Sequence, residues 1–155
     1  MKVFGKNGIT GCLKIILEVV LILGMLVIIM LPFVFRWLSE DIFNTYFMSN
    51  SYYFSLIFVE VCGIVMWFLL NEIRKIFKTL EKEEPFIENN VVHLKRSAKL
   101  CLVLGILFLV KTILDFSLLS PVMMICFFIG CLFLLVLAAV FEKGIKVKSE
   151  NDLTI

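Results

Sequence analysis

The sequence predicts an all-α membrane protein built from four transmembrane helices. Hydrophobic residues make up 61% of the 155-residue chain and charged residues only 18%, whereas soluble globular proteins contain ~45–50% apolar residues. The mean hydropathy is +1.05. The apolar residues fall into four long runs, and the basic residues gather on one side of them. A soluble core of this size cannot bury so much apolar surface, whereas a lipid bilayer can accommodate it.

The four predicted spans cover about residues 13–35, 53–73, 98–114 and 122–141. Each is close to the ~20 residues that cross a hydrocarbon layer of ~30 Å. The runs are continuous rather than alternating, which favours helices over barrel strands. In the first run the cost of inserting Lys14 and Glu18 is outweighed by Leu, Ile, Val and Phe side chains, which contribute roughly −5 to −10 kcal/mol. We therefore expect one integral membrane domain over residues 1–155.

The distribution of charge predicts the orientation. Every Lys and Arg residue except Arg36 and Lys111 lies before or at the start of the first span, between the second span and the start of the third, or after the fourth. The positive-inside rule then places both termini and the segment between the second and third spans in the cytoplasm. The net charge of +2 is too small to indicate direct binding of nucleic acid by the whole protein.

The segment between the second and third spans is predicted to be amphipathic. It begins with NEIRKIFKTLEKEE, whose apolar residues recur at helical spacing, so the second helix is expected to continue past the bilayer. Pro85 interrupts this helix, and PFIENNVVHLKRSAK then leads into the third span. Two interpretations stay open, a docking surface for a cytosolic partner and an interfacial hairpin on anionic lipid headgroups. The C-terminal tail is either disordered or paired with this segment.

Two stretches, PFIENNVVHLKRSA and FEKGIKVKSENDLTI, resemble the signatures of a bacterial membrane family known as domain of unknown function 2975. Members of that family are similar to this chain in length and in having four predicted helices. Asn90 stands where the family commonly has valine, and Ala98 stands where glycine is expected. The positions that match are Pro85, Phe86, Glu88, Asn89, Leu94, Lys95, Arg96, Gly144, Glu150, Asn151, Asp152, Leu153 and Thr154.

The resemblance implies a location in the bacterial cytoplasmic membrane and leaves the activity open. Family members are often encoded beside a small helix-turn-helix DNA-binding regulator. This implies a membrane-bound regulator or sequestering partner of such a transcription factor. The matching positions in the loop and in the last six residues are then the candidates for partner binding.

Charged residues inside the spans are further functional candidates, because an ionisable group in the bilayer is costly. They are Glu18, Glu60 and Lys111. Glu60 shares one stripe of its helix with Gly63, Trp67 and neighbouring polar positions, and is therefore expected to face other helices. These carboxylates support the alternative function, a small transporter or export protein.

The partners of these charges stay open at the level of the sequence. Lys111 can pair with Glu60, pair with Asp115 one turn later, or extend to the headgroups. Glu18 can pair locally with Lys14, one turn away.

No catalytic or metal-binding pattern is present in the sequence. His93 is the single histidine and has no second ligand at metal spacing. There is no phosphate-binding glycine loop and no nucleophile elbow. We expect a protein that is not an enzyme and that binds no metal or cofactor.

The five cysteines lie in or beside the spans without a C-x-x-C pair. Cys101 with Gly105, and Cys126 with Gly130, have the small-xxx-small spacing that allows helices to approach closely. This spacing suits packing within the bundle, with a dimer interface as the alternative.

Overall fold

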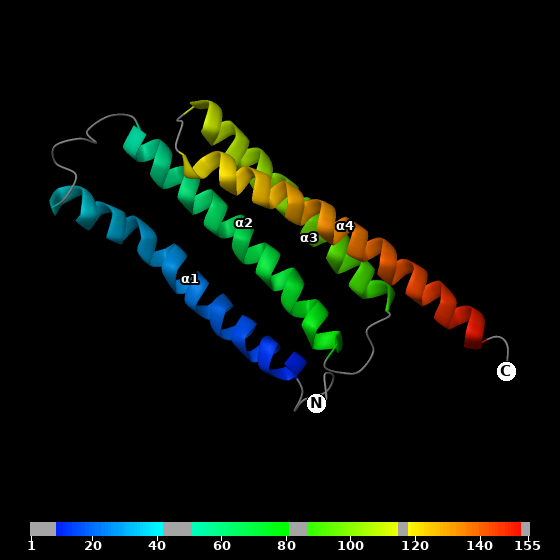
Figure 1. Cartoon of the computed structure of the whole chain (residues 1–155). Coiled ribbons are helices and arrows are strands. Elements are labelled where there is room, and N and C mark those ends of the chain that lie inside the picture. The colour runs from blue at the N-terminus through cyan, green and yellow to red at the C-terminus, as the bar shows by residue number, and fades with distance from the viewer. Residues whose placement is uncertain (1–8, 42–50, 81–86, 115–117, 153–155) are drawn as a thin grey trace.

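The computed structural model describes residues 9–41, 51–80, 87–114 and 118–152, which form four long helices. The helices are α1 (Ile9–Asp41), α2 (Ser51–Leu80), α3 (Glu88–Leu114) and α4 (Leu119–Asp152). Consecutive helices run in opposite directions (Figure 1). All four are long and apolar enough to cross a membrane, which confirms the prediction of an all-helical fold with four helices of membrane-spanning length.

Three helices extend beyond the predicted spans at one end of the molecule. α2, α3 and α4 contain 30, 27 and 34 residues, so they are roughly 40–50 Å long at 1.5 Å per residue. A hydrocarbon layer of ~30 Å cannot cover that length. The predicted extension of the second helix is confirmed as far as Leu80, and the tail is helical as far as Asp152. We call the end formed by the starts of α1 and α3 and the ends of α2 and α4 the basic end.

The helices pack in the order of the chain. α3 and α4 have the most extensive contact, α2 packs on α3, and α1 packs on α2. Within the described residues, the backbone of α1 makes no close approach to α3 or α4. Among the described residues of α1, Leu21 is the only large apolar side chain that is buried. The arrangement is therefore an open row rather than a closed bundle, and the exposed apolar side chains suit contact with lipid.

Two apolar clusters hold α2, α3 and α4 together. The first lies within the predicted spans and contains Leu69, Ala98, Cys101, Leu104 and Cys131. The second lies toward the basic end and contains Ile76, Val91, Leu94 and Ala138. Val91 and Leu94 belong to the amphipathic segment that precedes the predicted third span. Because their side chains are buried against α2 and α4, this segment is the first part of α3 and not a separate hairpin.

The small residues predicted to allow close helix contact do so between α3 and α4. A Cβ atom at Gly105 would lie 3.3 Å from the ring of Phe128, and one at Gly130 would lie 3.9 Å from Cys101 Sγ. Cys126 is exposed. Packing within the molecule therefore accounts for both glycines.

Candidate functional site

Contacts along one stripe of α2 hold α1 in place. Gly63 leaves room for Ile28, whose Cγ1 would lie 3.3 Å from a Cβ atom at position 63. One turn further on, Trp67 Nε1 donates a hydrogen bond of 3.1 Å to the backbone carbonyl of Leu21. The predicted stripe through Gly63 and Trp67 therefore does face another helix, and that helix is α1.

Glu18 pairs across the α1–α2 contact. Its Oε1 lies 3.4 Å from Arg74 Nε, and the two side chains are 39% and 38% exposed. The sequence suggested Lys14 as the local partner and assigned Arg74 to the charged segment after the second span. The predicted continuation of the second helix past Ile73 could have indicated this pairing, because it places Arg74 on the helix at the same distance from the membrane centre as Glu18.

A cavity of about 380 Å³ opens beside this ion pair. We call it the α1–α2 cavity. Its lining combines polar groups with aliphatic and aromatic ones, and includes Glu18, Ile22, Met25, Trp67, Asn71 and Arg74.

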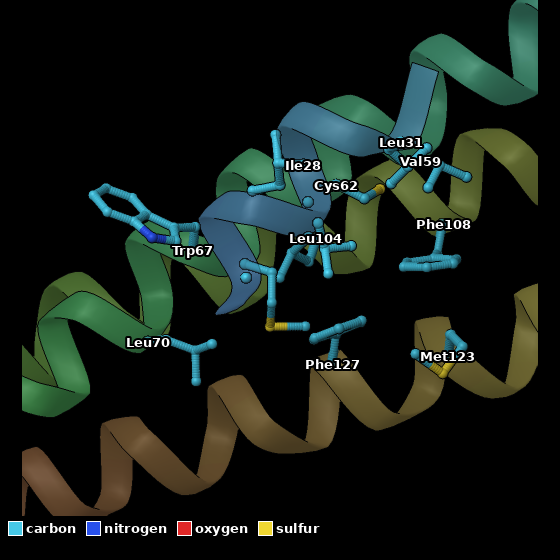
Figure 2. Close-up of a pocket in the computed structure, with 14 residues that line it drawn as sticks. Ile28, Leu31, Val59, Cys62, Trp67, Leu70, Leu104, Phe108, Met123 and Phe127 are labelled. Atoms are coloured by element: carbon cyan, nitrogen blue, oxygen red, sulfur yellow. The ribbon is translucent and has the colours of Figure 1, made fainter. Parts of the chain in front are cut away.

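A second cavity, of about 310 Å³, lies where the row of helices is open. We call it the apolar groove. Figure 2 shows Ile28 and Val59 on one side of it and Phe127 on the other, with Leu104 between them. All four helices contribute to its lining, which carries no charged side chain. Its walls therefore match the chemistry of hydrocarbon.

Glu60 and Lys111 are not brought together. Lys111 Nζ lies 4.9 Å from the ring centroid of Phe58, which in turn meets Phe108 of α3 edge to face at 5.3 Å. No ion pair joins Glu60 to Lys111 in the described ranges. Glu60 Oε2 is buried and has no hydrogen-bond partner among the described residues. A charged group without a partner is costly in such surroundings.

At the basic end, polar side chains join the last turns of α2 to the first turns of α3. Glu72 Oε2 lies 2.6 Å from His93 Nδ1 and Glu72 Oε1 lies 2.6 Å from Lys75 Nζ. Two turns further along α2 from Glu72, Thr79 Oγ1 lies 2.6 Å from the side-chain oxygen of Asn90. The sequence singled out His93 but did not identify Glu72, because the pairing depends on how the two helices are rotated.

The described residues contain no group of three or more His, Cys, Asp or Glu side chains placed to hold a metal ion.

The partner-binding candidates divide into exposed and buried residues. Glu88, Asn89, Lys95 and Arg96 are exposed on α3, and Glu150 and Asn151 are exposed on α4. Leu94 is 3% exposed and packs in the second apolar cluster, so its side chain is not available to a partner. Pro85, Phe86, Leu153 and Thr154 lie outside the described residues, as does the side chain of Asp152, the last residue of α4.

The charged residues among the exposed candidates belong to a larger charged surface at the basic end, which we call the basic platform. Lys95 of α3 reaches across it to Glu142 of α4, with Nζ 3.0 Å from Oε2. Basic residues outnumber acidic ones on this surface, which comprises Lys78, Glu88, Lys95, Arg96, Lys99, Glu142, Lys143, Lys146, Lys148 and Glu150.

A family model described as "Protein of unknown function (DUF2975)" matches residues 43–155. The chain belongs to this family. The match confirms the resemblance seen in the loop and tail, and it covers α2, α3 and α4, the helices that share the two apolar clusters. No curated protein and no solved structure matches the chain.

Proposed function

We propose that this DUF2975 protein is a membrane-bound docking protein that holds a small cytosolic DNA-binding regulator. The observation that carries the proposal is the basic platform, a helical surface that projects past the apolar spans and presents mostly charged side chains. The proposal places the basic end in the cytoplasm, in agreement with the positive-inside rule. That the partner is a helix-turn-helix regulator is the expectation drawn from the family resemblance.

The packing under the platform supports a role in protein binding. Val91 and Leu94 are buried between α2 and α4, so the surface above them is preformed. A rigid surface loses less conformational entropy on binding than a flexible one. If the amphipathic segment served only to lie on lipid, its apolar side chains would be needed on the outside, whereas Val91 and Leu94 are buried and, among the described apolar residues of the segment, only Val92 is exposed. Its surplus of Lys and Arg favours an acidic face on the partner and speeds the encounter.

The experiment is affinity capture with the tagged full-length protein in mild detergent, followed by mass spectrometry of the soluble proteins retained. We expect a small DNA-binding protein among them. Replacing Lys143, Lys146 and Lys148 together by glutamate should reduce its recovery about tenfold or more, because attraction becomes repulsion across the interface. Replacing the same three residues by arginine keeps the charge and should keep the capture.

Two results would contradict the proposal. One is that no DNA-binding protein is enriched, and the other is equal recovery by the glutamate and arginine variants. Deletion of residues 150–155 tests the tail separately, and on this proposal it lowers capture while membrane insertion is unchanged.

The second candidate function is small-molecule export driven by an intramembrane carboxylate. Glu60 favours it, because its buried oxygen without a hydrogen-bond partner suits a group that exchanges a proton during transport. If the protein confers resistance to a toxic compound, Glu60→Gln should abolish that resistance, and Glu18→Gln serves as the comparison. Resistance that survives both substitutions would exclude carboxylate-coupled export.

A further inference from the structure

The Glu18–Arg74 ion pair lies where the apolar part of α1 ends. Residues 19–35 carry no charged side chain and cover roughly 25 Å as a helix. That length is close to the ~30 Å thickness of the hydrocarbon layer. Glu18 and Arg74 are therefore at the depth where hydrocarbon gives way to phospholipid headgroups.

The α1–α2 cavity is amphipathic along its length. Glu18, Arg74 and Asn71 line its part nearer the basic end, and Ile22 and Met25 line its part nearer the membrane centre. Ile22 and Met25 are 65% and 55% exposed, so this side of the cavity faces the surrounding lipid. A phospholipid has the same polarity, a charged headgroup followed by an acyl chain.

The ion pair itself leaves hydrogen-bonding capacity unused. The guanidinium of Arg74 contacts Glu18 through Nε at 3.4 Å. No other charged or hydrogen-bonding partner of either side chain lies in the described part of the chain. Arg74 therefore retains its two terminal NH₂ groups as donors, and Glu18 retains Oε2 as an acceptor.

We propose that the α1–α2 cavity binds the headgroup of phosphatidylethanolamine, a phospholipid that carries a phosphate and a primary ammonium group and no further charge. The terminal NH₂ groups of Arg74 donate to the phosphate, since guanidinium and phosphate form strong, often bidentate hydrogen bonds. The ammonium group donates to Glu18. One acyl chain lies against Ile22 and Met25 and reaches toward Trp67.

Charge complementarity selects this headgroup over others. A headgroup with a phosphate but no cation, as in phosphatidylglycerol, brings a net negative charge beside Glu18, which is unfavourable. A quaternary ammonium, as in phosphatidylcholine, has no N–H to donate to the carboxylate. The inference concerns the α1–α2 contact and does not depend on the proposed docking of a regulator.

The test uses the fluorescence of Trp67 in the full-length protein. In a Trp37→Phe background, Trp67 is the only tryptophan, and lipids with brominated acyl chains quench it on contact. The protein is reconstituted in phosphatidylcholine vesicles that contain a small fraction of brominated phosphatidylethanolamine, phosphatidylglycerol or phosphatidylcholine. We expect apparent binding of phosphatidylethanolamine to be about tenfold tighter, since one charge-assisted hydrogen bond corresponds to roughly that factor.

The variants separate the two charges. Glu18→Gln should remove the preference for phosphatidylethanolamine over phosphatidylglycerol, whereas Arg74→Gln should lower the binding of both to the level of bulk lipid. Arg74→Lys retains the charge and should be intermediate. Glu142→Gln removes a carboxylate from an exposed ion pair that does not line this cavity and should leave the preference unchanged.

Gel filtration and circular dichroism show whether each variant is folded. If Arg74→Gln does not fold, Arg74→Lys takes its place in the test. Equal quenching by the three brominated lipids, or a preference that Glu18→Gln leaves intact, would overturn the proposal. Loss of the preference in Glu142→Gln would overturn it as well, because the effect would then not be specific to the cavity.

Discussion

Single residues at the basic end differ in how much their contacts contribute to stability. Glu72 is 13% exposed and lies 2.6 Å from both a lysine and a histidine, so its carboxylate makes two charge-assisted hydrogen bonds away from most solvent. Glu142 is 64% exposed and has one partner. Solvent screening makes an exposed pair worth ~0–1 kcal/mol, whereas hydrogen bonds to charged groups contribute ~1.5–3 kcal/mol. The contacts of Glu72 are therefore expected to contribute more to stability than the ion pair of Glu142.

Glu72→Gln should lower the free energy of unfolding by ~1–3 kcal/mol, because a sheltered carboxylate is lost and His93 keeps no charged acceptor. Glu142→Gln should lower it by at most ~1 kcal/mol. Both changes in the free energy of unfolding can be measured by unfolding the purified protein with SDS in mixed micelles and monitoring the loss of helix by circular dichroism. Equal effects of the two substitutions would show that Glu72 is more solvated than its contacts indicate.

At the scale of elements, the contact between α3 and α4 depends on small residues. The ring of Phe128 lies so close to Gly105 that it would have to shift slightly to admit an added carbon, whereas the position beside Gly130 has ordinary van der Waals room. Apolar surface alone does not drive helices together in lipid, so close packing is what holds them. The two glycines therefore tolerate substitution differently.

Gly105→Leu should destabilise the protein by ~1–3 kcal/mol, since Phe128 or the backbone must move to admit the new side chain. Gly130→Ala should be neutral or stabilising by up to ~1 kcal/mol, because alanine favours the helix. The same SDS unfolding experiment measures both. A larger loss for Gly130→Ala than for Gly105→Leu would contradict the helix contact described for α3 and α4.

At the scale of the whole molecule, α1 packs against fewer helices than α2 and α3 do, because the helices form an open row. It is held by its contacts with α2 and faces lipid elsewhere, while α2, α3 and α4 share two apolar clusters. The row leaves the apolar groove on one flank and the α1–α2 cavity at the basic end. The start of α1 and the end of α4 both lie at the basic end of the molecule (Figure 1).

Reporter tags fused to the two ends of the chain should therefore report the same compartment. Because almost all Lys and Arg residues lie toward that side, we expect the compartment to be the cytoplasm. A pair of fusions, one active only in the cytoplasm and one active only outside it, measures this. Tags that report opposite compartments would contradict both the four-span threading and the proposed docking of a cytosolic regulator.

The hydropathy and charge of the sequence determined the number of helices, their approximate spans and the extension of the second helix, while the resemblance of the loop and tail stretches indicated the family. These properties depend on local runs of residues, because a bilayer requires about 20 apolar residues wherever a helix crosses it. Only the tertiary structure showed which side chains contact one another. It paired Glu18 with Arg74, paired Glu72 with His93, buried Leu94 and left Glu60 apart from Lys111. Helices that are apolar on every side carry little information about their rotation or neighbours, so these contacts depend on how close packing arranges the four helices.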